Sequence, residues 1–122
     1  MEFDLTINSK RRYEYFLKKV SENKLIWGLA GIEGWCVCES NEYEDTGVMP
    51  FWSDEAYVRQ CAVDEWSHYK PTSITLGEFM NNWLSGMNED NLLVGVNWNA
   101  KLTGLEVEPV DLFKELQESL EG

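Results

Sequence analysis

The apolar residues of this chain repeat with two different periods, and the order of these periods limits the fold more than any other feature. Apolar residues three or four positions apart are typical of helices that bury one face. This spacing predicts four helices, at residues 9–23, at residues 54–66 after a cap at Ser53, at residues 75–86, and from Pro109 towards the C-terminal end.

Local residues mark several ends of these helices. Asn8 or Ser9 is suited to cap the first helix, because its side chain accepts a bond from a free backbone N–H. Thr75 and Glu78 have the spacing of a capping box, in which each side chain bonds to the other residue's backbone N–H. Gly86 readily takes the left-handed conformation that stops a helix.

Short apolar or alternating runs predict strands between the helices. Glycines bound a hairpin turn at residues 31–34, and an Asn-Ala-Lys turn at residues 99–101 belongs to a second hairpin. Because proline has no N–H to donate to a ladder, Pro50 predicts an edge strand or the end of a strand. The five predicted strands are residues 25–30, 35–39, 48–52, 92–98 and 105–107.

The order of helices and hairpins predicts an α+β fold, with a small, mostly antiparallel sheet of about five strands and about four helices. The strands outnumber those of a βαβ repeat, and their connections suit antiparallel pairing. The 122 residues show no internal repeat and no linker, and this length is typical of one domain. We therefore expect a single compact domain over residues 1–122, with residues 1–7 as a flexible N-terminus.

The chain is apolar enough to fold, but its apolar runs are too short to cross a bilayer. Hydrophobic residues make up 43% of it, whereas a disordered chain contains few of them. No apolar run approaches the roughly 20 residues of a membrane-spanning helix, and Glu2 and Asp4 stand where a signal peptide needs bases. We expect a cytoplasmic protein without a membrane association, in which the three cysteines stay reduced.

Charge is distributed unevenly along the chain. The net charge is −12, and residues 1–24 hold six of the ten bases but only four of the 22 acids. The remaining residues therefore carry four bases and 18 acids, and such a surface repels phosphate backbones. We expect no nucleic-acid binding and, instead, a protein partner with a basic surface.

Three cysteines and the single histidine are residue types that bind zinc. Cys36 and Cys38 share a face of a predicted strand, and His68 lies seven residues after Cys61. A C-x-C pair along a strand is not the C-x-x-C knuckle of zinc sites, and no base adjoins this pair to lower the pKa of a thiol. We therefore expect buried thiols, no bound metal and no cofactor, and keep the four residues as candidate ligands.

Aromatic residues beside an acidic loop indicate a contact surface. Phe51 and Trp52 follow a loop that contains Glu42, Glu44 and Asp45, and large rings are favoured at binding surfaces. We predict a binding surface formed by these five residues. In the alternative, both rings pack inward around the start of the second helix, as a hydrophobic staple does.

An ordered set of mostly aromatic, glycine and proline residues spans most of the chain. It comprises Tyr13-x-x-Phe16, Trp27-Gly28-Leu29, Gly34-Trp35, Pro50-Phe51-Trp52-Ser53-Asp54-Glu55-x-Tyr57, Cys61-x-x-x-Glu65-Trp66, Ile74-x-Leu76-x-x-Phe79-x-x-x-Trp83-Leu84-x-Gly86-Met87 and Gly104-Leu105-Glu106-Val107-Glu108-Pro109-x-x-Leu112. From about residue 9 to residue 120 this set resembles the bacterial family catalogued as domain of unknown function 2750, from which Cys36-x-Cys38 departs. The resemblance implies a small bacterial cytoplasmic protein and no particular catalytic residue. A fainter similarity, from Pro50 to Leu112, is to SseB-type N-terminal domains, and similarity of this kind does not establish a function.

We expect a non-enzymatic protein-interaction module of the regulator, adaptor or toxin-neutralising type. The alternative is a small metal-dependent or thiol-dependent enzyme that uses Cys61, His68 and the acids of residues 39–45. A third hypothesis is mimicry of nucleic-acid charge, which requires carboxylates in rows at phosphate-like spacing. A homodimer that pairs through an apolar edge strand, near Pro50 or within residues 92–98, is left open.

Overall fold

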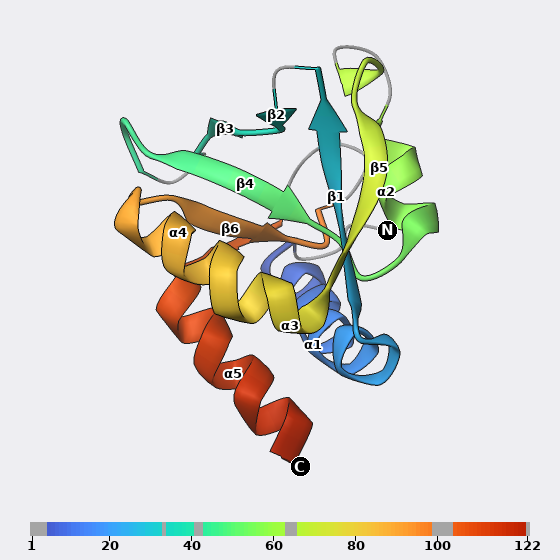
Figure 1. Cartoon of the computed structure of the whole chain (residues 1–122), viewed down its shortest axis with the longest axis vertical. Coiled ribbons are helices and arrows are strands. Elements are labelled where there is room, and N and C mark those ends of the chain that lie inside the picture. The colour runs from blue at the N-terminus through green and yellow to red at the C-terminus, as the bar shows by residue number, and fades with distance from the viewer. Residues whose placement is uncertain (1–4, 33, 41–42, 63–65, 99–103, 122) are drawn as a thin grey trace.

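The strands form two small sheets, which Figure 1 shows crossing near the middle of the molecule. This computed structural model describes residues 5–32, 34–40, 43–62, 66–98 and 104–121. The strands are β1 (Leu25–Gly31), β2 (Gly34–Trp35), β3 (Cys38–Glu39), β4 (Gly47–Phe51), β5 (Lys70–Thr75), β6 (Leu93–Val96) and β7 (Leu105–Val107). The helices are α1 (Leu5–Asn23), α2 (Glu55–Cys61), α3 (Leu76–Glu78), the π-helical segment η2 (Phe79–Trp83), α4 (Leu84–Glu89) and α5 (Pro109–Glu121).

The two sheets differ in the direction of their strands. The first has the order β2-β1-β5 and is antiparallel, whereas the second has the order β3-β4-β6-β7 and a parallel β4–β6 pair. A bridge joins the sheets where Trp27 and Trp52 exchange backbone hydrogen bonds of 2.8 and 2.7 Å. The predicted α+β class with mostly antiparallel strands is confirmed, but the strands divide into sheets of three and four where one sheet of about five was expected.

The predicted strand at residues 35–39 is divided between the two sheets. β2 ends at Trp35 and β3 begins at Cys38. Between them, the Cys36 N–H bonds to the Leu29 carbonyl at 2.8 Å, and the Cys36 side chain is buried against residues of both sheets while Val37 is exposed. A strand that crosses between sheets keeps the alternation of an unbroken one, so the pattern could not reveal the crossing.

Pro50 lies inside the four-stranded sheet, although the sequence predicted an edge strand or a strand end. β3 pairs only with Gly47 and Val48, and beyond Pro50 the N–H of Trp52 bonds to Trp27. Because successive N–H groups of a strand alternate in direction, the missing N–H of Pro50 falls in the gap between these two partners. Pairing with β6 on the other side is therefore uninterrupted.

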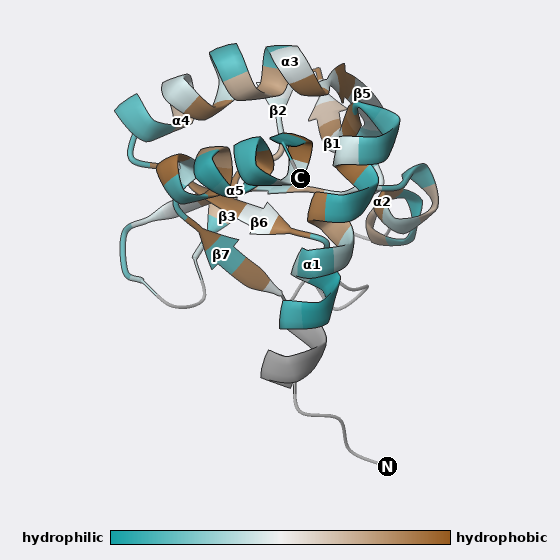
Figure 2. Cartoon of the chain, turned by 90° about the horizontal axis from the view of Figure 1, so that it is seen from below, coloured by the Kyte–Doolittle hydropathy of each residue, from teal (hydrophilic) through white to brown (hydrophobic). Residues whose placement is uncertain are grey.

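The four-stranded sheet is buried on both faces. On one face, a cluster centred on Phe16, Phe51 and Phe79 joins the sheet to α1, to the helix from α3 to α4 and to α5. On the other, a second cluster around Leu29, Trp52 and Val58 joins it to β1 and α2. All four residues of β6 are buried, as expected for a strand covered from both sides. Figure 2 shows that the outward surfaces of α1 and α5 are largely hydrophilic.

The N-terminal helix is longer than predicted. α1 begins at Leu5, so the predicted caps Asn8 and Ser9 lie inside it, and residues 5–7 are helical where a flexible segment was expected. Residues 1–4 lie outside the described residues. Within the described part of the chain, none of the helices has both the length and the apolar run that a bilayer-spanning helix needs.

The second helix is shorter than predicted. Asp54, rather than Ser53, occupies the cap position, and α2 ends at Cys61 instead of continuing towards Trp66. Ser53 is buried, and its N–H bonds to the side-chain oxygen of Asn97 at 2.8 Å. A tertiary hydrogen bond therefore holds the residue that the local sequence marked as a cap.

The helix from α3 to α4 begins as predicted and ends differently. The Thr75 hydroxyl accepts a hydrogen bond from the Glu78 N–H at 3.3 Å, which confirms the cap. Gly86 lies inside the helix, and the left-handed residue at its end is Asn91, with φ of 59°. The Leu92 N–H then bonds to the Met87 carbonyl at 2.9 Å, as in a Schellman motif. The predicted stop at Gly86 is wrong because asparagine also tolerates this conformation.

Candidate functional site

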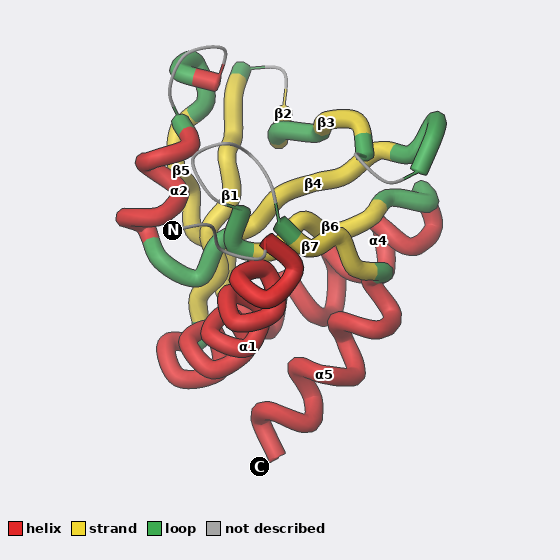
Figure 3. The backbone as a smooth tube through the Cα atoms, turned by 180° about the vertical axis from the view of Figure 1, so that it is seen from behind, coloured by secondary structure: helices red, strands yellow, loops and turns green. Residues whose placement is uncertain are grey.

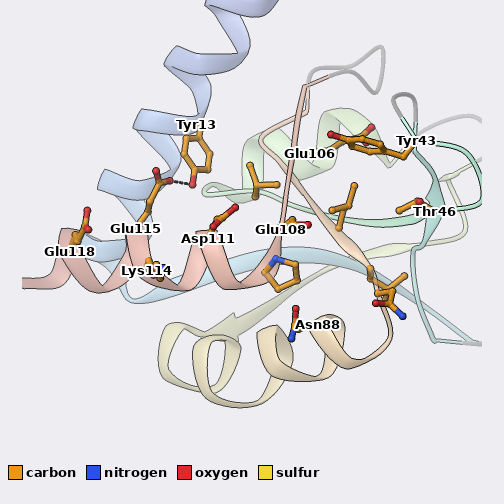
Figure 4. Close-up of a pocket in the computed structure, with 15 residues that line it drawn as sticks. Tyr13, Tyr43, Thr46, Asn88, Glu106, Glu108, Asp111, Lys114, Glu115 and Glu118 are labelled. Carbon is orange, nitrogen blue, oxygen red and sulfur yellow. Dashed lines mark hydrogen bonds between the residues drawn. The ribbon is translucent and has the colours of Figure 1, made fainter.

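A groove of about 940 Å³ lies between α5, β7 and the loop that follows β3. Its side chains come from distant parts of the chain (Figure 4), namely α1, this loop, the segment from the end of α4 to the start of β6, β7 and α5. Among the described residues, one base, Lys114, lines the groove together with five carboxylates. We call it the acidic groove, and its carboxylates are Glu106, Glu108, Asp111, Glu115 and Glu118.

Three of these carboxylates form a stripe along α5. Asp111, Glu115 and Glu118 are separated by four and three residues, so the helix places them on one side. Pro109 suits the first turn of a helix and begins α5 shortly after β7 ends, which brings Glu106 and Glu108 to the head of the stripe. Like charges four residues apart destabilise a helix by about 0.2–0.5 kcal/mol. Asp111 is favourable in the first turn of the helix, but the stability of α5 does not explain Glu115 and Glu118.

Glu115 is the carboxylate most affected by its surroundings. Burial raises its pKa, and the neighbouring negative charge of Glu118 raises it further. The Tyr13 hydroxyl of α1 donates a hydrogen bond to a carboxylate oxygen of Glu115 (Figure 4). This bond ties α1 to α5 across one end of the groove.

A second bond fixes the opposite wall. The Ser40 hydroxyl donates to a carboxylate oxygen of Glu106, and the Tyr43 N–H donates to the Ser40 oxygen at 2.9 Å. The loop that follows β3 is therefore attached to β7, although the two segments are more than 60 residues apart. Tyr43 is exposed and lines the groove.

Lys114 does not neutralise the groove. It lies three residues after Asp111 and four before Glu118, which is a spacing that permits ion pairs on a helix. In the part of the chain that the structure describes, it forms no ion pair with any groove carboxylate. The groove therefore presents a surplus of negative charge to whatever enters it.

The prediction that Phe51 and Trp52 form a contact surface is wrong, because both side chains are 0% exposed. Phe51 packs edge-to-face on Phe79, with ring centroids 4.9 Å apart. The Trp52 indole N–H donates to the Trp98 carbonyl at 2.9 Å. Both rings are core residues, as in the alternative of inward packing.

The acidic part of the predicted contact surface lies beside the groove. Glu44 and Asp45 are exposed, but they do not line the groove, whereas Tyr43 and Thr46 of the same loop do. Glu42 lies outside the described residues. The predicted loop is thus adjacent to a charged hollow whose main carboxylates were not predicted.

The candidate zinc ligands are not brought together as a group. Cys36 and Cys61 are buried in the second core cluster and Cys38 packs against it. His68 is exposed, with its ring 4.2 Å from that of Tyr69, and it is not on α2, which ends at Cys61. Among the described residues, no three histidine, cysteine or acidic side chains are placed to hold a metal ion together.

Burial suppresses ionisation of all three thiols. It raises the pKa of Cys36 to about 12 and those of Cys38 and Cys61 to about 11. Smaller contributions come from the charge of Cys38 on Cys36 and of Glu106 on Cys38. Since the thiolate is the nucleophile in cysteine chemistry, these positions are poorly suited to thiol catalysis.

Sequence reasoning missed the groove because its carboxylates come from the end of a strand and the next helix. The spacing of Asp111, Glu115 and Glu118 was available in the sequence. An acidic stripe on a helix usually marks a solvated face, however, and only the approach of Tyr13 and of the loop after β3 turns this stripe into the wall of a groove.

Comparison with known proteins identifies the family of the chain and nothing about its activity. No curated protein and no solved structure gives a significant match, and the fainter similarity to SseB-type domains has no support in these comparisons. The family model described as "Protein of unknown function (DUF2750)" matches residues 13–116. Because this match spans most of the chain, the protein belongs to the DUF2750 family.

Proposed function

We propose that this protein is a non-enzymatic interaction module that binds a lysine- or arginine-containing segment of a partner protein in the acidic groove. The observation that carries the proposal is the convergence of five carboxylates and one lysine on a single hollow. Complementary charge accelerates association and selects against partners of the same sign. A regulator, an adaptor or a toxin-neutralising protein would use such a groove.

The dimensions of the groove suit a short peptide segment. Along α5, Pro109 and Glu118 are nine residues apart, which corresponds to about 14 Å of helix. An extended chain covers this length with about four residues. Two or three basic side chains of one segment could therefore meet the carboxylates of the stripe at the same time.

Binding would also relieve an unfavourable feature of the free protein. Burial and the charge of Glu118 raise the pKa of Glu115, so its ionised form is less stable relative to the protonated form than in a free glutamate side chain. A lysine or arginine placed between these two carboxylates favours the ionised form and lowers that pKa. Part of the repulsion along α5 would then contribute to affinity.

The enzyme hypothesis receives less support from the described residues. Cys61 is buried with a raised pKa, and His68 is exposed next to Tyr69 in a different environment. We propose the cytoplasm as the compartment, because three free cysteines persist in a reducing environment.

Fluorescence anisotropy with a labelled decapeptide that alternates lysine and alanine tests the proposal. The double variant Asp111→Asn, Glu118→Gln removes two charges from the groove, and we expect it to bind at least about tenfold more weakly, as for the loss of charged hydrogen bonds. Glu14→Gln with Glu22→Gln is the matched control, because these exposed residues of α1 carry the same charge outside the groove.

Equal loss of binding in both double variants would show attraction to net charge alone and contradict a site in the groove. Light scattering on the same samples reports self-association. A dimer that the groove variant abolishes would make the basic surface of α1 in a second copy the occupant, in place of a partner protein.

A further inference from the structure

A second hollow, of about 470 Å³, lies on the opposite side of α1 from the acidic groove. Figures 2 and 3 both show α1 between α5, which walls the groove, and α2, which walls this hollow. We call it the arginine pocket. Its lining includes Arg11, Arg12 and Tyr15 of α1, Tyr57 and Gln60 of α2, and Trp98 after β6.

The charge of the arginine pocket is opposite to that of the protein as a whole. Among the described residues, its lining contains two arginines and no carboxylate, in a chain whose net charge is −12. Of the described acids near the pocket, two have their contacts elsewhere and one lies at its edge. Glu55 pairs with Arg59 and Glu14 lines a different hollow between α1 and α5, whereas Asp54, which accepts a hydrogen bond from the Ser53 hydroxyl at 2.9 Å, also bonds to the Tyr15 hydroxyl at the edge of the pocket.

The two arginines are presented differently. Arg12 is anchored, because its Nε donates to the Asn97 carbonyl at 2.8 Å and the Asn97 side-chain amide donates to the Arg12 carbonyl at 3.3 Å. Arg11 is exposed and has no hydrogen bond or ion pair with the described residues. One guanidinium is thus fixed in the wall while the other is able to reach a ligand.

Aromatic rings form the rest of the pocket. Tyr15 and Tyr57 extend from different helices, with ring centroids 6.0 Å apart and planes tilted by 49°. They are 36% and 39% exposed, whereas Trp98 at the base is 3% exposed. Burial raises the pKa of Tyr15 to about 12, with further contributions from Tyr57 and Asp54. Its hydroxyl therefore stays neutral at neutral pH, and the negative charge beside it is that of Asp54.

We infer that the arginine pocket binds a small aromatic anion, whose ring packs against Tyr15 and Tyr57 while its carboxylate or phosphate group binds Arg11. Arginine forms paired hydrogen bonds with carboxylates and phosphates alike, so the anionic group has two sources that share one chemistry. The volume lies within the range of about 300–1,000 Å³ that is usual for small-molecule sites. Gln60 adds an exposed amide at the rim for a polar substituent of the ring.

Isothermal titration calorimetry of the full chain tests this inference with three probes: AMP, 4-hydroxybenzoate and inorganic phosphate alone. We expect at least one aromatic anion to bind at least about tenfold more tightly than phosphate, because the ring adds stacking to the ionic contact. Tighter binding of AMP identifies a phosphate ligand, and tighter binding of 4-hydroxybenzoate identifies a carboxylate ligand.

Arg11→Gln should weaken the tighter probe at least about tenfold, the size expected for a charged hydrogen bond. Lys18→Gln is the matched control, since Lys18 is exposed on the same helix but lines the hollow shared with α5. Tyr57→Leu removes a ring from the wall, and circular dichroism checks that it folds. The inference is overturned if neither aromatic anion binds at millimolar concentration, if phosphate alone binds equally well, or if Arg11→Gln and Lys18→Gln behave alike.

Discussion

The acidic groove and the arginine pocket use the two sides of one helix in opposite ways. Tyr13 faces the groove, where its hydroxyl bonds to Glu115, whereas Arg12 and Tyr15 face the pocket. The groove is walled by carboxylates on α5 and β7, and the pocket by arginines and rings. α1 therefore separates a surface suited to a basic macromolecule from a hollow suited to a small anion.

The two sites also differ in how they are joined to the core. Three of the groove carboxylates, Glu108, Asp111 and Glu118, are exposed, so they can change without disturbing the buried clusters. The base of the pocket is Trp98, which belongs to the second cluster and whose backbone carbonyl accepts the Trp52 indole N–H. The groove is therefore formed largely by charged surface residues, whereas the base of the pocket is formed by a packed core residue.

The largest predicted effect tests this difference in packing. Trp98→Ala should lower the free energy of unfolding by about 3–5 kcal/mol, because it empties a buried site. Glu118→Gln in the groove should change it by less than about 0.5 kcal/mol, as surface substitutions usually do. Urea unfolding followed by circular dichroism measures both. Similar losses in the two variants would mean that the groove is as much a part of the core as the pocket.

Asn97 offers a second way to break the pocket while leaving the groove intact. Its side chain bonds to Ser53 and to the Arg12 carbonyl, and its φ of 44° is left-handed. Asn97→Ala should destabilise the protein by about 1–3 kcal/mol by leaving buried polar groups unpaired, with added strain from alanine at this φ. Asn97→Gly is the control, because it removes the same bonds without that strain.

In both Asn97 variants the affinity of the pocket probe should fall while the decapeptide still binds the groove. Unfolding measurements and the two titrations check this. If the glycine variant is no less stable than the unaltered chain, then the side-chain hydrogen bonds of Asn97 contribute nothing to stability, and the backbone carbonyl of residue 97 is enough to hold the Arg12 side chain.

Ionic strength should affect binding at the two sites to different extents. The proposed binding in the groove would depend on several exposed charges, so raising salt from low to physiological concentration should weaken the decapeptide about tenfold, as screening over a Debye length of about 10 Å implies. The pocket probe gains part of its affinity from ring contacts and should weaken less. Titrations at matched salt concentrations measure the two slopes. Equal slopes would contradict a contribution from the rings.

The sequence predicted the parts of this molecule that local residues determine. The stripe of α1, the Thr75 cap and the start of α5 at Pro109 follow from short-range patterns, and the structure has them. The crossing of residues 35–39 between two sheets was not predictable, since an alternating strand carries no information about its partners. The same limit hid the parallel pairing of β4 with β6.

Neither site could be located from the sequence, because each is assembled from distant segments. Tyr13 and Glu115 are 102 residues apart, and Arg12 and Asn97 are 85 apart. For Phe51 and Trp52 the error was the opposite one, because a contact surface was predicted where the structure has none. Their ring type suggested binding, but both rings are buried in the core.

The smallest effect concerns the pH dependence of the groove. The pKa of Glu115 is raised in the folded protein by burial and by Glu118, so the folded state binds a proton more tightly than the unfolded state does. The contribution of this residue to stability is therefore fully present below its unfolded pKa and is lost as pH rises through its folded pKa.

Glu115→Gln should stabilise the chain at pH 7 by about 0.2–0.5 kcal/mol, the size of a like-charge pair on a helix. This gain should vanish under acidic conditions below that unfolded pKa, where the carboxyl is protonated in both states. Urea unfolding at both pH values measures the difference, and Glu14→Gln on α1 is measured alongside as the same substitution outside the groove. A loss of stability at pH 7 in Glu115→Gln would mean that the bond from Tyr13 outweighs the repulsion along α5, and that the stripe is held in place by structure and not left available for a basic partner.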